Sequence, residues 1–419
     1  MTSRHDKEAF VWIWLPQETS PVVAGKLTAD NGNLVFNYGR SYLERKRTIS
    51  LYEAELPLRS GLLPLKGGLS MPGCIRDASP DAWGRRVLIN RLIGRTGPGT
   101  DTAQLDELSY LLESGSDRVG ALDFQRSPTV YEPRDPVNAT LEELQEAAER
   151  VEKGLPLSPD LDQALYHGSS IGGARPKALL EDATKKYIAK FSSSSDLYSV
   201  VKAEFIAMRL AALAGLNVAP VSLVRAAGKD VLLIERFDRL LTAQGWTRRS
   251  MVSALTLFGF DEWLARYASY ETLAEIIRHG FTDAAATLRE LFSRLVFNIL
   301  CGNTDDHARN HAAFWDGAML TLTPAYDICP QGRAGNEASQ AMLISENNRM
   351  SRLVGCVNAA HYFLLSREDA LAIADRQKRI ITENWTTVCD EAPLSAVERT
   401  LFWGRQFLNP SAFEGLEGD

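Results

Sequence analysis

The stretch Asn303-Thr304-Asp305-Asp306-His307-Ala308-Arg309-Asn310 decides how this sequence is interpreted. It is the densest polar cluster of the chain, and it directly follows an apolar stripe of helical spacing that begins after Asp283 and that Gly302 is expected to end. The stripe predicts a buried helix, and a loop attached to such a helix holds its side chains in fixed positions. The structural alternative is a solvated turn with a helix cap.

The spacing within this loop favours a chemical role. Asp305 and Asn310 stand in the Asp-x-x-x-x-Asn spacing of protein-kinase catalytic loops, where the aspartate orients the attacking hydroxyl and the asparagine holds a metal ion. Beyond a strand predicted at 320–322, Asp327 follows Tyr326 and is expected to face the same cleft as the second metal aspartate. Alone, Asp327 would be a turn residue at the end of a hairpin.

Lys190 is the candidate cation for nucleotide phosphates. It lies inside the otherwise apolar, strand-like run 187–191, and Glu204 follows on the next predicted helix. Lysine is rarely buried without a partner, and kinases hold a strand lysine against phosphates with a helix glutamate. The structural alternative is an edge-strand lysine that faces solvent.

Two weaker signals surround this lysine. Residues 167–177 form a small-residue loop that can bring backbone N–H groups close to phosphates, although it is neither a Walker A nor a GxGxxG motif. Alone, its Gly172-Gly173 pair is more often a plain turn. Residues 235–239 follow a strand predicted at 231–234 and are a candidate connection between lobes that contacts adenine; alone they would be a surface charge run.

Composition excludes several classes of protein. The 419 residues carry 46 Lys+Arg and 53 Asp+Glu, a net charge of -7, and 45% hydrophobic residues, which is typical of an ordinary globular chain. Without a long basic block, binding nucleic acid or an anionic membrane is not expected to be its main role. Five scattered cysteines without CxxC predict buried thiols in a reducing compartment. No run approaches the length of a membrane span, so we expect a cytoplasmic protein.

The chain is expected to have an α+β fold. Strand-like runs at 11–15, 34–38 and 49–52 predict a β-rich N-terminal module over residues 1–124, with a helix that starts at Ser79-Pro80. The proline-rich segment 125–139 is predicted to be a linker. Thr140 and Glu143 form a capping-box pattern that opens a second domain over 140–419, with strands at 178–180, 187–191 and 231–234 and a largely helical C-terminal part that includes 366–385.

The order of glycine loop, lysine strand, glutamate helix, hinge, catalytic loop and metal aspartate resembles the HipA family, the serine/threonine-kinase toxins of bacterial type II toxin–antitoxin modules. The resemblance rests on residues 170–177, 235–239, 303–310 and 322–327, and in the N-terminal module on 23–27, 79–86 and 117–122. It covers nearly the whole chain and implies a two-lobed, protein-kinase-like domain after the N-terminal module.

The resemblance also implies roles for individual residues. Asp305 would be the catalytic aspartate, Asn310 and Asp327 the Mg²⁺ ligands, and Ser170, or alternatively Ser169, the self-phosphorylation position. The ATP-binding set that it implies is Gly172, Gly173, Ala174, Arg175, Pro176, Lys177, Lys190, Glu235, Arg236, Phe237, His307, Ala308, Arg309, Asn310, Tyr326 and Asp327.

Two positions depart from the family pattern. Asp306 stands where the family usually has glycine, and Arg309 where it usually has lysine. Asp306 is expected to add a negative charge beside the metal site and to make the loop less permissive, whereas His307 keeps its family place and is expected to brace the loop.

The resemblance implies an ATP- and Mg²⁺-dependent serine/threonine kinase whose target is an aminoacyl-tRNA synthetase, so that phosphorylation stops translation. The implied partner is a helix-turn-helix, HipB-like antitoxin that supplies most of the DNA contacts. Two alternatives stay open: a small-molecule phosphotransferase on the same scaffold, and a catalytically weak nucleotide-binding partner of a DNA-binding antitoxin.

Overall fold

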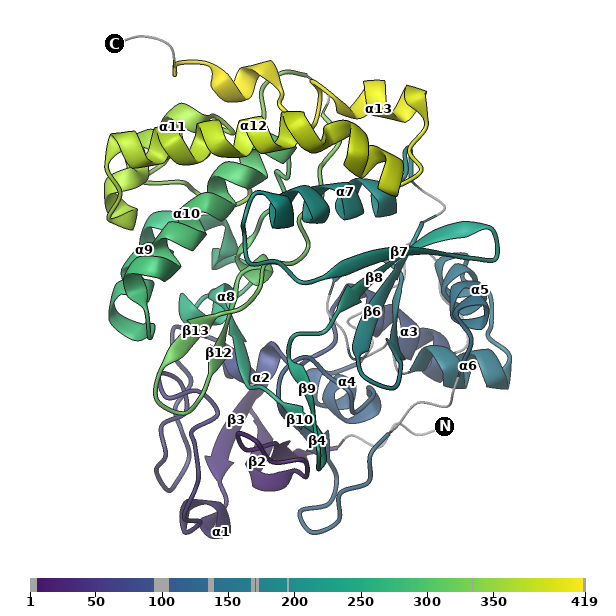
Figure 1. Ribbon diagram of the computed structural model, residues 1–419. Helices are drawn as coiled ribbons and strands as arrows, with labels where there is room; N and C mark the ends of the chain where they lie inside the picture. The colour runs from purple at the N-terminus through teal and green to yellow at the C-terminus, as the bar shows by residue number, and fades with distance from the viewer. Residues whose placement is uncertain are drawn as a thin grey trace. The chain divides into compact units, whose positions relative to one another are not determined.

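The computed structural model of the chain describes residues 6–93, 105–134, 139–166, 170, 173–193, 196–333 and 335–416. The chain forms two compact units (Figure 1). Unit 1 comprises residues 1–196, 224–252 and 314–318, and unit 2 comprises residues 197–223, 253–313 and 319–419. These units divide the chain differently from the domains expected from sequence, so the boundary at 125–139 stays a prediction.

The first sheet of unit 1 has the strand order β3-β2-β1-β4. Its strands are β1 (Glu8–Ile13), β2 (Val22–Asp30), β3 (Asn33–Tyr38) and β4 (Leu122–Gln125). Asn31 and Gly32 connect β2 to β3 with positive φ angles of 48° and 83°, as a tight two-residue hairpin requires. Because β4 pairs with β1, the chain before residue 122 is brought back against the N-terminal strands.

One strand predicted for this module is wrong. Residues 49–52 form no strand, although Tyr52 is buried. The Ser50 carbonyl instead accepts a hydrogen bond from the Trp315 indole at 2.9 Å, and Tyr52 packs edge-on against the same ring. The apolar residues that led to the prediction of a strand are therefore explained by tertiary packing on Trp315.

The second sheet of unit 1 has the order β5-β6-β8-β7 and confirms the three strands predicted there. Its strands are β5 (Lys177–Glu181), β6 (Lys186–Phe191), β7 (Val221–Ala226) and β8 (Lys229–Glu235). Helices α5 (Leu141–Glu152) and α6 (Pro159–Tyr166) pack on it, and α5 begins with the predicted Thr140/Glu143 capping box. Trp83 and Val87 of α3 (Ala82–Ile93) join the same hydrophobic core, so the N-terminal part of the chain helps to build this layer.

The remaining elements of unit 1 are short. They are α1 (Arg40–Leu43), α2 (Gly73–Arg76), α4 (Glu107–Glu113) and the hairpin of β9 (Arg239–Thr242) and β10 (Gly245–Arg248). A three-stranded sheet of order β11-β12-β13 contains β11 (Met251–Ser253), β12 (Ala312–Trp315) and β13 (Leu320–Leu322).

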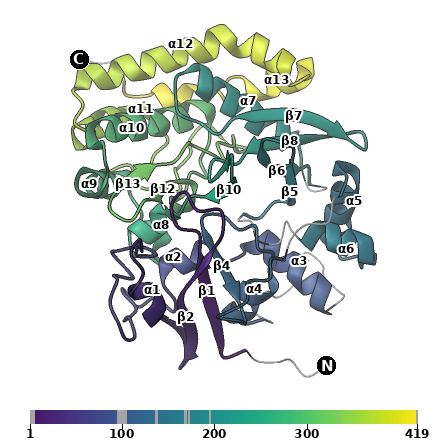
Figure 2. The same ribbon diagram turned by 60° about the horizontal axis from the view of Figure 1, so that its bottom comes forward.

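Unit 2 is largely helical. Its helices are α7 (Val200–Leu213), α8 (Ala254–Leu257), α9 (Tyr270–Gly280), α10 (Ala284–Cys301), α11 (Leu353–Ala359), α12 (Arg367–Glu391) and α13 (Ala396–Phe402). The apolar stripe of α10 is buried as predicted, and the helix packs against α9, α11 and α12. Figures 1 and 2 show α12 lying across α10 and α7. A Ser366/Asp369 capping box starts α12 at the predicted position.

The structure confirms the predicted α+β class, with an N-terminal sheet and a helical C-terminal part. All five cysteines are buried free thiols, as predicted. In the part of the chain that the structure describes, no helix combines the length and the apolar character that a membrane crossing needs.

A buried ion network connects two distant segments of unit 1. Asp117, between α4 and β4, lies 3.0 Å from Arg236 Nη1 and 2.7 Å from Arg239 Nη2. Asp238 lies 2.9 Å from both Arg236 Nη2 and Arg239 Nη1, and it also accepts the Gly120 N–H at 2.8 Å. The segment after β8 is therefore an interior ionic cluster, which rules out the alternative of a surface charge run.

Substitution of Asp238 by asparagine should destabilise unit 1. Breaking a buried ion pair on one side costs about 3–5 kcal/mol, because the remaining charge stays buried. Burial alone would raise the pKa of Asp238, but Arg236 and Arg239 outweigh it and lower that pKa from 3.8 to about 2. The carboxylate therefore stabilises the fold above about pH 4, and this contribution is lost as pH falls towards 2.

Denaturant unfolding followed from pH 7 to pH 2 measures both effects. Asp238→Asn should lower the midpoint at pH 7 and lose less stability between pH 4 and 2 than the wild type does. The control is Asp30→Asn, at an exposed position of the β2–β3 hairpin. Parallel pH curves for wild type and Asp238→Asn would contradict the assignment.

Candidate catalytic site

The loop after α10 begins with a left-handed glycine. Gly302 has φ 73° and caps α10, as the sequence predicts, and a Cβ atom at this position would lie 2.6 Å from the Gln406 carbonyl oxygen. The next residue, Asn303, donates its N–H to the Asn298 carbonyl at 2.8 Å. The loop therefore leaves the helix in one direction, which only glycine allows.

Backbone hydrogen bonds from distant segments hold the rest of the loop. The Thr304 carbonyl accepts the Ala341 N–H at 3.0 Å, and the His311 carbonyl accepts the Ala254 N–H at 2.7 Å. Between them, the Tyr326 hydroxyl donates to the Arg309 carbonyl at 2.7 Å. Because Asn310 is also buried, the loop is a fixed part of unit 2 and not the solvated turn that the sequence left open.

Three of the predicted site residues come together in unit 2. Asn310 donates its Nδ2 to the Asp305 carbonyl at 3.3 Å, so its Oδ1 is the atom that could bind a cation. Asp327 has a left-handed backbone with φ 59°, an uncommon and strained conformation for aspartate that clusters at functional sites. The pKa of Asp305 is raised by burial and then by the charges of Asp327 and Asp306, and His307 opposes this rise.

This donor set fits Mg²⁺. Among the residues with a described position, no group of three His, Cys, Asp or Glu side chains forms a metal cage. Mg²⁺ does not need one, because it is usually held by one or two carboxylates together with substrate phosphates and water. A cation beside Asp327 and Asn310 would also relieve the repulsion that raises the pKa of Asp305.

Asp306 has a different place from the one expected. Its carboxylate is 3% exposed and accepts hydrogen bonds from the Tyr270 hydroxyl and from His311 Nε2, the latter at 3.1 Å. Burial would raise the pKa of Asp306, but the interactions with His311 and Tyr270 outweigh it and lower that pKa. The expected charge beside the metal site is thus largely compensated inside unit 2, and its effect on Asp305 is smaller than that of Asp327.

The same contacts identify residues that the sequence did not single out. Tyr270 at the start of α9 and His311 after the loop brace it through Asp306, a role that the sequence assigned to His307. Arg309, the second departure from the family pattern, forms an ion pair with Glu262. A histidine directly after the polar loop was the available signal for the brace, but Tyr270 had none.

Unit 1 contains the predicted phosphate-binding lysine. Lys190 lies on β6, which is hydrogen-bonded to β5 on one side and to β8 on the other, and it is 7% exposed. This excludes the edge-strand alternative. Glu204 is buried on α7 in unit 2, so the Lys190–Glu204 pair, which would join two units, stays a prediction.

The glycine loop is partly described. Ser169 and Gly172 lie outside the described residues, whereas Ser170 and Gly173–Lys177 lie within them. Gly173 donates its N–H to Asp81 Oδ2 at 2.7 Å, and its carbonyl accepts the Trp83 N–H at 3.1 Å. The start of α3 therefore holds the end of this loop.

Other side chains of the glycine loop contact protein groups. The Ser170 hydroxyl is buried and donates to the Asp117 carbonyl at 3.3 Å. Arg175 forms an ion pair with Asp196, and a Cβ atom on Gly173 would lie 2.2 Å from Lys177 Nζ. Lys177 thus lies directly against the loop that is predicted to bind phosphates.

The side chains predicted to contact adenine form contacts with other side chains of the protein. Glu235 pairs with Lys185 at 2.5 Å, Arg236 belongs to the buried network with Asp117, and Phe237 packs edge-on against Phe314. The side chain of Arg236 is therefore a structural brace, and its backbone N–H is also engaged, by the Lys186 carbonyl at 2.8 Å.

Comparison with known proteins identifies the chain. The sequence profile of the HipA N-terminal domain matches residues 14–125, and that of the HipA-like C-terminal domain matches residues 169–391. The chain belongs to the HipA family.

Relatives of this HipA-family chain are named kinases. The provisionally named kinase Y4mE of Sinorhizobium fredii is 28% identical over 346 residues, which cover 73% of this chain and 74% of that protein. The serine/threonine-protein kinase toxin HipA of Shewanella oneidensis is 30% identical over 183 residues, covering 38% and 42% of the two chains. The predicted kinase identity is confirmed: the chain is a HipA-family kinase.

A solved structure shows the same fold. In the Shewanella oneidensis MR-1 complex of HipA, HipB and operator DNA, the matching chain has a TM-score of 0.67 at 21% identity. The match covers 93% of this HipA-family chain and 97% of the solved one.

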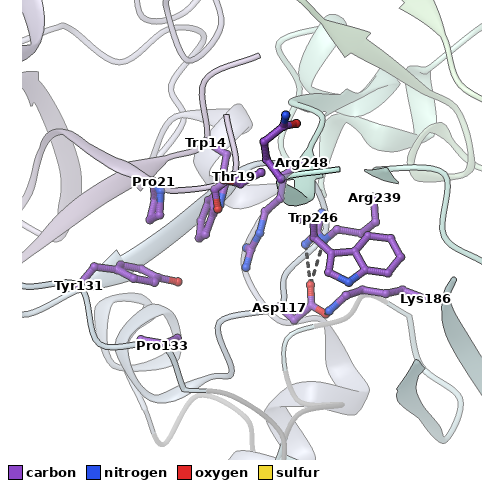
Figure 3. Close-up of a pocket in the computed structure, with 12 residues that line it drawn as sticks. Trp14, Thr19, Pro21, Asp117, Tyr131, Pro133, Lys186, Arg239, Trp246 and Arg248 are labelled. Atoms are coloured by element: carbon purple, nitrogen blue, oxygen red, sulfur yellow. Dashed lines mark hydrogen bonds and ion pairs between the residues drawn. The ribbon is translucent and has the colours of Figure 1, made fainter. Parts of the chain in front are cut away.

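A pocket in unit 1 lies apart from these predicted site residues. Its volume is about 380 Å³, and it is lined by aromatic residues such as Trp14, Tyr131 and Trp246 and by the outer part of the ion network. Figure 3 shows Lys186 and Arg239 converging on Asp117 at one end of the pocket. None of the residues predicted to bind ATP lines it.

Substitution of Gly302 by alanine should destabilise the HipA-family kinase and disturb its catalytic loop. A left-handed conformation costs alanine about 1–2 kcal/mol, and here the new Cβ also meets the Gln406 backbone at 2.6 Å. Gly404→Ala is a matched control, because Gly404 has φ 74° and a Cβ atom there would meet nothing within 4 Å. Thermal unfolding should show a clearly larger loss for Gly302→Ala than for Gly404→Ala, and equal losses would contradict the close approach.

Proposed function

We propose that this HipA-family kinase is the toxin of a type II toxin–antitoxin module and transfers phosphate from ATP to a serine or threonine of a protein. The observation that carries the proposal is the juxtaposition of Asp305 and Asn310, on the loop fixed to α10, with Asp327, which follows β13. Phosphoryl transfer needs a base-like carboxylate near the acceptor and oxygen ligands for Mg²⁺.

The proposed roles follow from the chemistry of each group. Asp305 orients the acceptor hydroxyl and takes up its proton, for which a raised pKa is suited. Asn310 and Asp327 hold Mg²⁺, which neutralises charge on the phosphates. Lys190 and the loop Gly172–Lys177 contact the phosphates, and the segment Glu235–Phe237 contacts the adenine.

The residues near the catalytic loop complete the proposed nucleotide site. They are His307, Ala308, Arg309 and Tyr326, of which Tyr326 and Arg309 are joined by a hydrogen bond. The charge of Asp306 was the reason for considering a catalytically weak protein. Because Tyr270 and His311 both hydrogen-bond to that carboxylate, we do not favour this alternative.

We propose an aminoacyl-tRNA synthetase as the protein target and a helix-turn-helix, HipB-like protein as the antitoxin. The complex of a Shewanella HipA with HipB and operator DNA supports such a partner. A net charge of -7 supports a division of labour in which the antitoxin makes most of the DNA contacts. Five free thiols support a place in the reducing cytoplasm.

Asp305→Asn and Asp327→Asn should each keep the fold and abolish most phosphoryl transfer. Loss of a positioned base-like group costs roughly 10²- to 10⁴-fold, and Asp327→Asn should also weaken Mg²⁺ binding, so that its residual activity needs a higher Mg²⁺ concentration. The measurement is labelling by radioactive ATP in a bacterial lysate, with Asp375→Asn on the exposed face of α12 as the control. Growth arrest on expression should follow the same order. Equal labelling by all four proteins would refute the site.

Ser170 should be phosphorylated by the enzyme itself, and the product should be inactive. Its hydroxyl is buried against the Asp117 carbonyl, so a phosphate cannot be accommodated there and the loop has to leave. The phosphate would add about -1.5 to -2 charges and three acceptor oxygens at this buried position. Phospho-Ser170 protein should therefore bind ATP poorly.

Mass spectrometry of the wild type and of Asp305→Asn protein decides the first half. Phosphate on Ser170 in both proteins, or in neither, would refute self-phosphorylation, and phosphate on Ser169 would move the position. Nucleotide titration decides the second half, because unchanged ATP affinity of the phosphorylated form would show that the loop remains in place.

A further inference from the structure

Four aromatic side chains lie together in sequence between α8 and α9 of unit 2. We call Phe258, Phe260, Trp263 and Tyr267 the aromatic face. Phe258 and Phe260 are stacked with ring centroids 5.4 Å apart, whereas Trp263 is 77% and Tyr267 55% exposed. Aromatic side chains are enriched at protein–protein interfaces, where an exposed ring can anchor a partner.

One side of the aromatic face is tied to the catalytic loop. Glu262, next to Trp263, forms an ion pair with Arg309, which lies between Ala308 and the proposed Mg²⁺ ligand Asn310. Asp261 accepts the Leu264 N–H at 2.8 Å and thereby starts the 3-10 turn Leu264–Tyr267, which directly follows Trp263 and ends with Tyr267. The position of the face is therefore fixed relative to the loop.

A second tie comes from the segment 339–350. Its ends pair at Ser339 and Met350, and the Ala341 N–H is bonded to the Thr304 carbonyl of the catalytic loop. Arg349 of this segment donates to the Arg266 carbonyl at 2.9 Å. The aromatic face and segment 339–350 are thus joined to each other and to residues on both sides of Asp305.

The charges on this surface are unequal. Both nearby acids of the turn are engaged, Glu262 by Arg309 and Asp261 by the backbone. Arg266 lies over the Tyr267 ring, 5.0 Å from its centroid, and neither it nor Arg349 has a carboxylate at ion-pair distance in the described chain. The surface therefore offers exposed aromatic rings beside two arginines that lie outside ion-pair distance of the described carboxylates, and its one exposed acid in segment 339–350 is Glu346.

We infer that the aromatic face, with Arg266 and Arg349, binds the segment of the protein substrate that flanks the acceptor serine or threonine. The occupant is a chain segment that combines a bulky apolar residue with acidic residues, because aromatic anchors and arginines dominate the binding energy of such contacts. The inference rests on the proposed function, since it takes Asp305 as the point where the acceptor hydroxyl lies. It deepens that function by naming what the enzyme reads around the hydroxyl.

A positional peptide library with one central serine tests the inference on the full-length protein. The wild type should select acidic and bulky apolar residues near the serine. Trp263→Ala should lower kcat/KM on the selected peptides about tenfold or more, and Arg266→Glu should replace the acidic preference with a basic one. ATP affinity should not change in either variant. The matched controls are Val397→Ala and Arg379→Glu, at exposed positions of α13 and α12.

Unchanged selection in Trp263→Ala and Arg266→Glu would overturn the inference. So would a wild type that phosphorylates itself yet shows no preference around the serine. If light scattering shows that Trp263→Ala changes the oligomeric state while selection stays the same, a second copy covers the face and the inference is wrong. If the wild type phosphorylates neither itself nor any peptide, the proposed function fails and the inference falls with it.

Discussion

Asp117 and Asp238 share the same two arginines, Arg236 and Arg239, in the interior of unit 1. None of these charges is tolerable alone in a buried place, because an unpaired buried ion costs several kcal/mol. The network joins the turn before β4 to the segment after β8. The Ser170 hydroxyl donates a hydrogen bond to the backbone carbonyl of the same Asp117. The turn before β4, the segment after β8 and the glycine loop of unit 1 therefore meet at one electrostatic network.

In unit 2 the corresponding constraint is the end of α10. Gly302 turns the chain against the Gln406 backbone, and each later part of the loop is bonded to a segment far away in sequence. Asp306 adds a side-chain anchor through Tyr270 and His311. Asp305 and Asp327 can then lie close enough to repel each other without moving apart, because the fold and not the carboxylates sets their positions.

Local signals predicted much of this fold. The capping box at Thr140 and the glycine that ends α10 are each encoded in a few adjacent residues, and both were found where the pattern indicated. The helix expected from Ser366 also begins at that residue. The segment 49–52 misled because its apolar side chains pack on Trp315, more than 260 residues away in sequence. The β9–β10 hairpin went unnoticed because Leu240 and Leu241 are both exposed and show no alternation.

The same limit applies to the candidate site. The spacing of Asp305, Asn310 and Asp327 and the apolar surroundings of Lys190 were visible in sequence, because each follows from one helix end or one strand. The partners of Asp306 were not, since Tyr270 lies 36 residues upstream on another helix. The Asp117 network was not visible either. Its members are separated by about 120 residues, so the sequence could not distinguish buried ion pairs from solvent-exposed charges.

The contacts of α3 have a consequence for the modular independence of the chain. Trp83 and Val87 lie in the hydrophobic core that supports the second sheet. Asp81 and the Trp83 backbone N–H also form hydrogen bonds with Gly173. A proteolytic cut within 125–134 would leave both fragments associated through this core, but a shortened gene that begins near residue 140 would encode a sheet with an open, apolar underside. The N-terminal module therefore supplies part of the core on which the second sheet rests.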